Sequence, residues 1–245
     1  MAYPPREPGK LGRLPGQIPV GLRSLTYYVA GSLPKPPSCV PVPPVADWGM
    51  LGNATYGDCG VAGLQHCFMA DAAVTHLTEP NASDQQAIEY YLNYTGGQDT
   101  GVVLSQYLAH VRANGYYGHT VQAYAPVAVH DVPTLQSAVA LYDCVYTGIV
   151  VTQAMQEAFA HHRTWTTEML QSPVAGGHCV PIVAFDDHEL QVVTWGGVQA
   201  VTYSMWHAIS SEAWAVITGE FVQGHGDGRG VDLAALTADL DRLAA

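Results

Sequence analysis

The sequence predicts an α+β fold in which helices come first and an antiparallel sheet follows. Between residues 59 and 114, apolar residues recur every three or four positions, the spacing of helices with one buried face. After about residue 120, β-branched and alternating apolar runs take over, and two of them flank the short turn at 186–188. Helices grouped before strands, instead of alternating with them, are typical of the α+β class.

The composition is that of a compact globular protein. The 245 residues are 48% hydrophobic and only 12% charged, and the chain is long enough to bury a sizeable core. A net charge of −12, with Lys10 and Lys35 as the only lysines, argues against binding to nucleic acid and against a basic membrane helix. We expect no membrane partner, because no stretch reaches transmembrane length and no signal peptide is evident.

The cysteines are odd in number and irregularly spaced, which is not the pattern of a disulfide framework. They are Cys39, Cys59, Cys67, Cys144 and Cys179. A reducing compartment fits this pattern, so we expect the cytoplasm or a particle assembled there. A zinc site could use residues of the right type, but their spacing matches no standard closed site. These residues are Cys59, His66, Cys67, His178 and Cys179. We therefore expect no metal and no cofactor.

Residues 1–45 are rich in proline and glycine and are predicted to form an N-terminal arm. Proline removes backbone donors and fixes φ, so we expect an extended segment with at most one short strand, around 25–29. The arm is either a floppy leader or a segment that wraps its own domain or a neighbouring subunit. Its apolar residues favour the second interpretation. These residues are Leu22, Leu25, Tyr27, Tyr28 and Val29.

The remainder, residues 46–245, is predicted to be one domain that starts with a helical lobe over 46–118. Helices are expected over 60–76, from Ser83 onward, and over 102–114. Ser83 and Gln86 have the spacing of a capping box. The run 78–81 ends the first helix, and Gly115 ends the third. The glycine-rich run 94–101 lacks the lysine of a phosphate-binding loop and is predicted to be a turn.

A sheet lobe is predicted over 119–222, with a closing loop and helix over 223–245. A helix is expected from Asp131 to about Leu141. Strands are expected over 120–129, 145–151, 178–185, 189–195, 199–203 and 214–218. His161 and His162 are predicted to form a solvated loop patch, and Trp206 and Trp214 to pack the sheet.

The stretch 53–64 carries the strongest chemical signal. The turn-forming run 55–58 places Cys59 at the start of an apolar segment that is typical of a helix. Unpaired N–H groups and the macrodipole at a helix N-terminus stabilise a thiolate, which is the nucleophilic form of cysteine. On this stretch alone, an equally good interpretation is that Cys59 packs as a small buried apolar residue.

A histidine on the other half of the chain offers a partner for Cys59. His178 opens a predicted strand, so the two side chains can meet across a cleft between the lobes. Cysteine catalysis needs an imidazole that takes the thiol proton and later protonates the leaving group. It also needs donors for the developing oxyanion, and the Cys59 N–H and the Asn53 side-chain amide are the candidates.

In this order the motifs resemble those of the papain-like cysteine peptidases, over most of residues 45–218. The first half contributes Val-Ala-Asp-Trp48, an amide six residues before the cysteine, and Gly-Asp-Cys-Gly60. The second half contributes a glycine-rich loop before a helix, a helix followed by a strand, Gly-Gly-His178 and Thr-Trp-Gly196. The resemblance implies a two-lobed fold with Cys59 as nucleophile, His178 as base, and Asn53 in place of the oxyanion-hole glutamine.

The chain departs from the family's pattern at positions that affect activity. Val193 stands where the family places the asparagine that orients the histidine, and Thr194 takes that role only if the strand register shifts by one. No aromatic residue follows the nucleophile, and Asn53 is one methylene shorter than glutamine. Secreted or lysosomal members of the family have a long inhibitory pro-region and a secretion signal. We expect neither in this chain. Loss of the histidine's orienting partner commonly lowers the rate by orders of magnitude.

The sequence therefore predicts a papain-like thiol hydrolase of reduced activity, which cleaves peptide or amide bonds of a peptide or protein substrate in the inter-lobe cleft. The alternative is the same fold, catalytically impaired, as a structural or interaction protein of a larger assembly such as a virus (phage) particle. In that case the arm contacts a partner subunit or a second copy. A third possibility keeps the thiol chemistry and transfers the acyl group to an amine instead of water.

Overall fold

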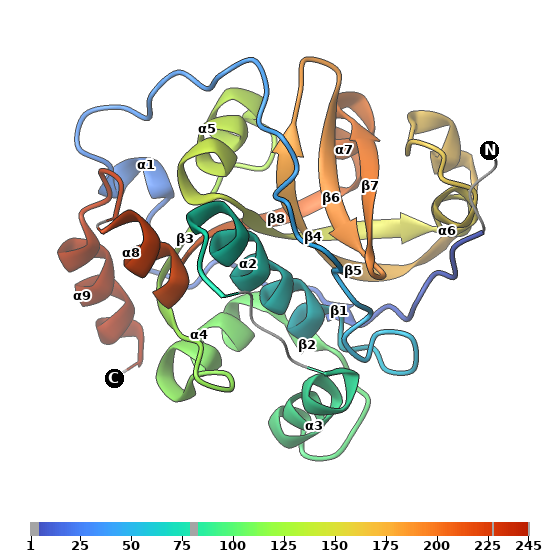
Figure 1. Ribbon diagram of the computed structural model, residues 1–245, viewed down its shortest axis with the longest axis horizontal. Coiled ribbons are helices and arrows are strands. Elements are labelled where there is room, and N and C mark those ends of the chain that lie inside the picture. Colours follow the sequence, from blue (N-terminus) through green and yellow to red (C-terminus); the bar gives the residue numbers. More distant parts are fainter. Residues whose placement is uncertain (1–4, 79–82, 227, 245) are drawn as a thin grey trace.

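The computed structural model describes residues 5–78, 83–226 and 228–244, and these residues form two packed halves. One half is a six-stranded antiparallel sheet in the order β3-β8-β4-β5-β6-β7, and the other is helical (Figure 1). The sheet strands are β3 (Val121–Pro126), β4 (Val145–Thr152), β5 (Val174–Phe185), β6 (Glu189–Thr194), β7 (Gly197–Thr202) and β8 (Ser210–Thr218). The predicted α+β, two-lobed architecture is confirmed.

The central helix, α2 (Cys59–Thr75), is buried along almost its whole length. A helix that is apolar on all sides belongs in a core, and α2 packs between β5 and the helix α8 (Gly219–His225). Its small residues permit close packing against the sheet. A Cβ added to Gly63 would lie 2.8 Å from the Cys179 sulfur. The helix thus fixes the position of Cys59 relative to β5.

Two other helices of this half form close to where the sequence predicts them. Helix α3 (Asp84–Thr95) has the capping box of Ser83 and Gln86. Helix α4 (Leu104–Asn114) follows a two-residue strand, β2 (Val102–Val103), so it starts two residues after its predicted start. Helix α2 ends at Thr75. The predicted stop at 78–81 lies outside the described residues, apart from residue 78.

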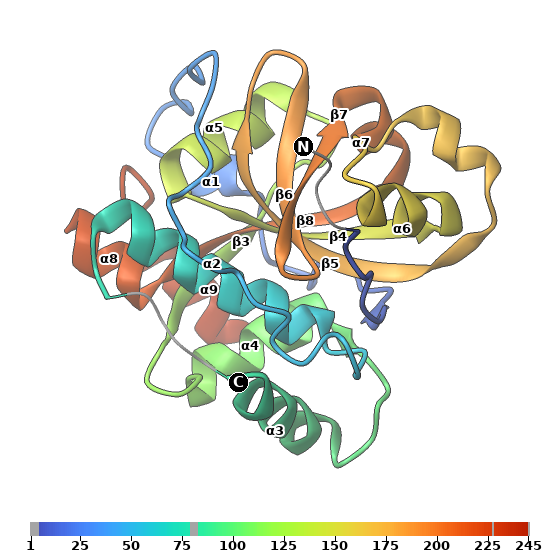
Figure 2. The ribbon, with the colours of Figure 1, turned by 45° about the vertical axis from the view of Figure 1, so that its right-hand side comes forward.

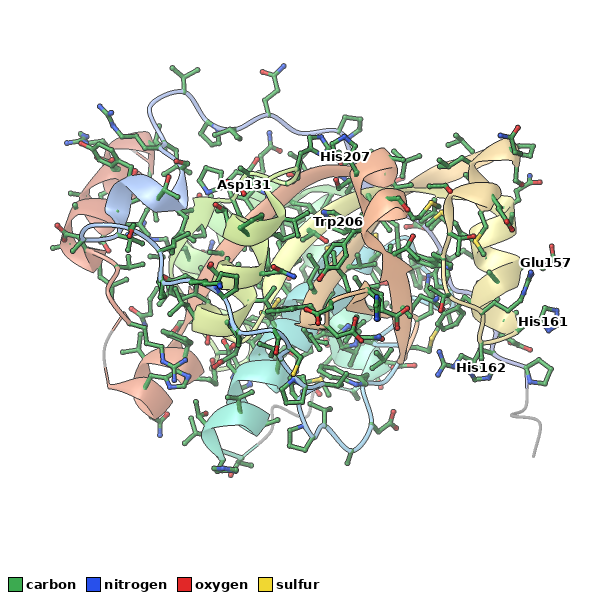
Figure 3. All side chains as sticks on the ribbon, turned by 90° about the horizontal axis from the view of Figure 1, so that it is seen from above. Asp131, Glu157, His161, His162, Trp206 and His207 are labelled. Carbon is green, nitrogen blue, oxygen red and sulfur yellow. The ribbon has the colours of Figure 1, made fainter. Side chains whose placement is uncertain are left out.

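Several short helices around the sheet were not predicted from the sequence. They are α6 (Gln153–Ala160), α7 (Tyr203–Ile209), α8 and a 3₁₀ turn (Thr167–Gln171), and they join the predicted α5 (Val132–Tyr142) and α9 (Leu233–Ala244). Figure 3 shows Trp206 on α7 directed into the molecule. His161 and His162 lie at one end of the molecule, beside α6. No helix in the described ranges is long and apolar enough to cross a membrane.

The N-terminal arm crosses the surface of its own chain (Figures 1 and 2). Its strand β1 (Arg13–Leu14) pairs in parallel with β2. The predicted strand at 25–29 is wrong, because Leu25–Tyr28 forms a single helical turn, α1. Leu25 and Tyr28, three residues apart, are both buried, and the Tyr28 hydroxyl donates to Asp239 on α9 at 2.7 Å. A helical spacing puts both side chains on one face.

Candidate active site

Cys59 is the first residue of α2, and its side chain is buried. Its backbone N–H has no carbonyl one turn earlier to bond, so it points out of the helix N-terminus. Burial raises the pKa of the thiol to about 12, although hydrogen bonds from the backbone of Cys179, Gly12 and Gly60 oppose this rise. In the conformation described here, Cys59 is therefore a neutral thiol.

His178 on β5 is held by contacts with the end of β6. Its Nε2 lies 2.8 Å from the Thr194 hydroxyl, and its ring stacks on Trp195 with a centroid distance of 4.8 Å. Its Nδ1 is buried and has no hydrogen-bond partner among the described residues. Burial lowers the pKa of His178 to about 3, so the imidazole is neutral. A neutral ring bonded through Nε2 leaves Nδ1 as the atom available for proton transfer.

The pairing of β5 with β6 explains why Thr194, and not Val193, reaches the histidine. Ile182 pairs with Val192, but Ala184 pairs with Gln191, so β5 carries one extra residue between these positions. Such a bulge changes which residues of two strands face each other. Val193 is also buried beside the site, but its side chain cannot accept or donate a hydrogen bond.

The structure brings the four predicted site residues to one small cavity between the lobes. Cys59, His178, Asn53 and Thr194 all line it, and its volume is about 10 Å³. That volume is at the lower limit for a single water molecule. The four side chains thus share one cavity, which is too small to admit a peptide.

Asn53 lies in the turn before α2, and its amide is already in use. Its Nδ2 donates to the Tyr56 carbonyl at 3.0 Å, which stabilises the turn that delivers Cys59. One Nδ2 hydrogen makes this bond, and the amide also lies near the Asp58 carboxyl, whose pKa it lowers. The Asn53 backbone carbonyl accepts from the Lys10 N–H at 2.7 Å.

Two titratable residues beside the site were not assigned a catalytic role from the sequence, and His66 was considered there only as a possible zinc ligand. Asp58, which precedes the cysteine, is fully buried, and neither carboxyl oxygen has a hydrogen-bond partner in the described part of the chain. Burial raises its pKa to about 8, and the nearby Asn53 amide offsets this only in part. His66 lines the same cavity and bonds the Trp48 carbonyl at 2.9 Å, and burial lowers its pKa to about 4. Only adjacency to Cys59, and helical spacing from it, marks them in the sequence.

The N-terminal arm occupies the cleft in front of Cys59. A Cβ on Gly12 would lie 1.7 Å from the Gly57 carbonyl oxygen, and a Cβ on Gly9 would lie 2.7 Å from the Trp195 ring. The Gly12 carbonyl accepts from the Val102 N–H at 2.8 Å on the helical side. On the sheet side, a Cβ on Gly177 would lie 2.4 Å from the Arg13 carbonyl oxygen. Residues 9–13 therefore contact both halves of the molecule beside the cavity.

The remaining candidate groups contribute nothing to this cavity. His161 and His162 are exposed and directly follow the last residue of α6 (Figure 3). Within residues 5–78, 83–226 and 228–244, no group of three or more His, Cys, Asp or Glu side chains is arranged to hold a metal ion. Cys67 is buried in the core, where it contacts Cys144.

Comparison with known proteins gives structural matches only. The sequence matches no family model and no curated protein. Xylellain, a cysteine protease from Xylella fastidiosa, matches with a TM-score of 0.69 at 14% identity, over 88% of this chain and 98% of its own. The cysteine protease and lectin-like domains of Cwp84, a surface layer associated protein of Clostridium difficile, give 0.57 at 12% identity, over 86% of this chain and 55% of theirs.

A third match extends the comparison to an animal protein. The digestive procathepsin L 3 of Tenebrio molitor larval midgut matches with a TM-score of 0.56 at 14% identity, over 86% of this chain and 75% of its own. These matches cover most of the chain, so they define its architecture. At such low identity they show the fold alone. The chain therefore has a papain-like fold.

Proposed function

We propose that the chain is a latent thiol hydrolase of peptide or amide bonds, whose cleft is closed by its own residues 9–13. The observation that carries the proposal is the arrangement of His178. Its Nε2 contacts Thr194 while its unpartnered Nδ1 shares a small cavity with the Cys59 thiol. Acyl transfer to an amine would use the same residues.

The closed state accounts for the neutral form of both groups. Burial is the main cause of the raised pKa of Cys59 and of the lowered pKa of His178. When the arm leaves, water reaches the cleft and the desolvation of both groups decreases, so a thiolate and an imidazolium can form together. The helix N-terminus then favours the thiolate.

Each step of the reaction then has an assigned group. The Cys59 thiolate attacks the substrate carbonyl, and the Cys59 N–H and the second Asn53 Nδ2 hydrogen stabilise the tetrahedral oxyanion. The His178 imidazolium gives its proton to the leaving amine as the C–N bond breaks, leaving a thioester on Cys59. Water, deprotonated by His178, then attacks the thioester, and the acid product and the thiol are released.

Displacing the arm tests this proposal. The backbone of Gly12 is not in the left-handed region, so Gly12→Leu excludes the arm through its side chain and not through backbone strain. We expect Cys59 to react with iodoacetamide at pH 7.5 at least about 100-fold faster than in the unmodified chain. The exposed Cys39 serves as an internal reference thiol. A control is Val20→Leu, in the same arm at a position that is 95% exposed.

The same variants separate hydrolysis from mere exposure of a thiol. Gly12→Leu should cleave unstructured protein substrates. When His178→Ala is added, the rate at which Cys59 reacts with iodoacetamide should fall to that of Cys39. If Cys59 in Gly12→Leu reacts no faster than Cys39, the activated nucleophile does not exist. The fold then serves as a structural or interaction module, and the arm in the closed cleft is a fixed part of it.

A further inference from the structure

Arg13, the residue after Gly12, inserts its side chain into the sheet lobe. Its Nε and Nη2 donate to Oε1 of Glu212 on β8 at 2.9 and 2.6 Å. The two side chains are only 7% and 9% exposed. Exposed ion pairs contribute little to stability. A buried pair is favourable only when the geometry of its hydrogen bonds is close. The contact therefore has the character of guanidinium recognition by a single carboxylate.

The surroundings of Glu212 prepare it for this contact. The Trp214 indole N–H donates to the other oxygen, Oε2, at 2.9 Å and fixes the plane of the carboxylate. Gly148 on β4 leaves space for the guanidinium, because a Cβ there would lie 2.5 Å from Arg13 Nε and 2.9 Å from Glu212 Cγ. Gly148, Glu212 and Trp214 thus form a pocket, here called the Glu212 pocket, that fits a long side chain ending in a planar cation.

This pocket adjoins the catalytic cavity. Gly148 pairs with Glu212 on one side and with Cys179 on the other. Cys179 lines the cavity together with Cys59. Gly12, one residue before Arg13, hydrogen-bonds the Cys59 thiol through its backbone. A peptide whose backbone passes Cys59 therefore presents a neighbouring side chain to the Glu212 pocket.

We propose that the Glu212 pocket selects substrates with an arginine side chain close to the scissile bond, and that Arg13 occupies it as an internal mimic. The proposal rests on the thiol hydrolase function above. Once the arm leaves, Glu212 keeps the bond from Trp214 but loses its cation. A substrate arginine restores the pair, whereas a neutral side chain leaves the carboxylate unpaired. Lysine binds less well, because it lacks the planar set of donors.

A binding experiment tests the pocket without relying on turnover. The full chain with Gly12→Leu and Cys59→Ala is titrated with a fluorescent peptide of residues 9–16, Gly-Lys-Leu-Gly-Arg-Leu-Pro-Gly. Matched peptides carry lysine or norleucine in place of the arginine. We expect the arginine peptide to bind roughly 10- to 100-fold more tightly than the norleucine peptide. Glu212→Gln in the same chain should abolish most of that difference.

The outcomes separate the pocket from the proposed function. Absence of peptide binding, equal binding of the arginine and norleucine peptides, or a preference that persists in Glu212→Gln overturns the Glu212 pocket. Substrate cleavage is then measured in Gly12→Leu with Cys59 restored. Cleavage without preference for arginine would also overturn the pocket while leaving the hydrolase intact. Arginine-selective binding without any cleavage would leave the pocket intact and refute the hydrolase.

Discussion

The contact between His178 and Thr194 replaces the asparagine contact that the papain-like resemblance implies. A hydroxyl at 2.8 Å from Nε2 can fix the ring orientation and tautomer, which is the task of an orienting residue. Thr194 hydrogen-bonds the histidine among the proposed reacting groups. In the proposed mechanism it is a positioning residue, and its replacement should affect chemistry more than substrate binding.

Thr194→Val tests that role in the Gly12→Leu chain. Valine keeps the shape and removes the hydroxyl, so we expect kcat to fall about 10-fold or more while KM changes little. Thr194→Ser should retain most of the activity, because it retains the hydroxyl. Thr166→Val is a matched control, since the Thr166 side chain does not cap the adjoining turn. An unchanged kcat in Thr194→Val would mean that Trp195 alone orients the ring.

Asp58 makes the stability of the protein depend on pH. Its pKa is raised from 3.8 to about 8 by burial, so the folded chain holds a proton that the unfolded chain releases. This contribution is complete below pH of about 4 and is lost as pH rises toward about 8, at up to roughly 1.4 kcal/mol per pH unit. His66 and His178, whose pKa values are lowered, act with the opposite sign and only below their ordinary pKa of 6.5.

Asp58→Asn should therefore reduce the slope between about pH 6.5 and 8, where the two histidines no longer contribute. Buried Asp71 and Asp143, whose pKa values are also raised, keep a slope of the same sign. We expect the variant to gain free energy of unfolding relative to the unmodified chain as pH rises across this window. Urea unfolding at several pH values measures it, with the exposed turn residue Asp187, changed to Asn, as a control. A parallel decline in both chains would mean that Asp58 stays ionised in the fold.

At the scale of elements, the sequence predicts what periodicity and capping specify. The α2 pattern, the Ser83 capping box and the strand pattern of β4 all act locally, and all three elements form where the sequence places them. The short helix α7 was missed, because seven residues that include the buried Trp206 give no clear helical repeat. Its start is set by Thr202, which accepts from the Met205 N–H and also ends β7.

The residues of the candidate site could be predicted from the sequence. The hydrogen-bond partner of His178 and the closure of the cavity by the arm could not. Cys59 starts α2 as its local signal predicts, whereas His178 is the fifth residue of β5 and not, as the sequence predicts, its first. The partner of the histidine depends on a bulge between β5 and β6, which no local pattern specifies. The arm's path through the cleft depends on contacts far apart in the sequence. Its only trace there is Gly9 and Gly12, at which no side chain fits.

At the scale of the whole molecule, the arm connects the two lobes. Residues 9–13 bond Asn53 and Val102 on the helical side, while Arg13 bonds Glu212 on the sheet side. Opening the cleft therefore requires that this segment detach from both lobes at once. The buried ion pair is the contact of the arm for which solvation matters most, because breaking it leaves two charges to rehydrate.

A double-mutant cycle on this pair measures how firmly the arm is held. Arg13→Met should lower the free energy of unfolding by about 3 kcal/mol if the arm stays in place, because Glu212 remains buried without its cation. Glu212→Met should have a similar effect, and the double variant should recover most of the loss, since two apolar side chains of similar length replace the pair. Urea denaturation gives these values, and Cys59 alkylation in each variant reports whether the arm has left the cleft. If the double variant instead loses the sum of the two single effects, the arm is held mainly by its backbone contacts, and the ion pair contributes selectivity without stability.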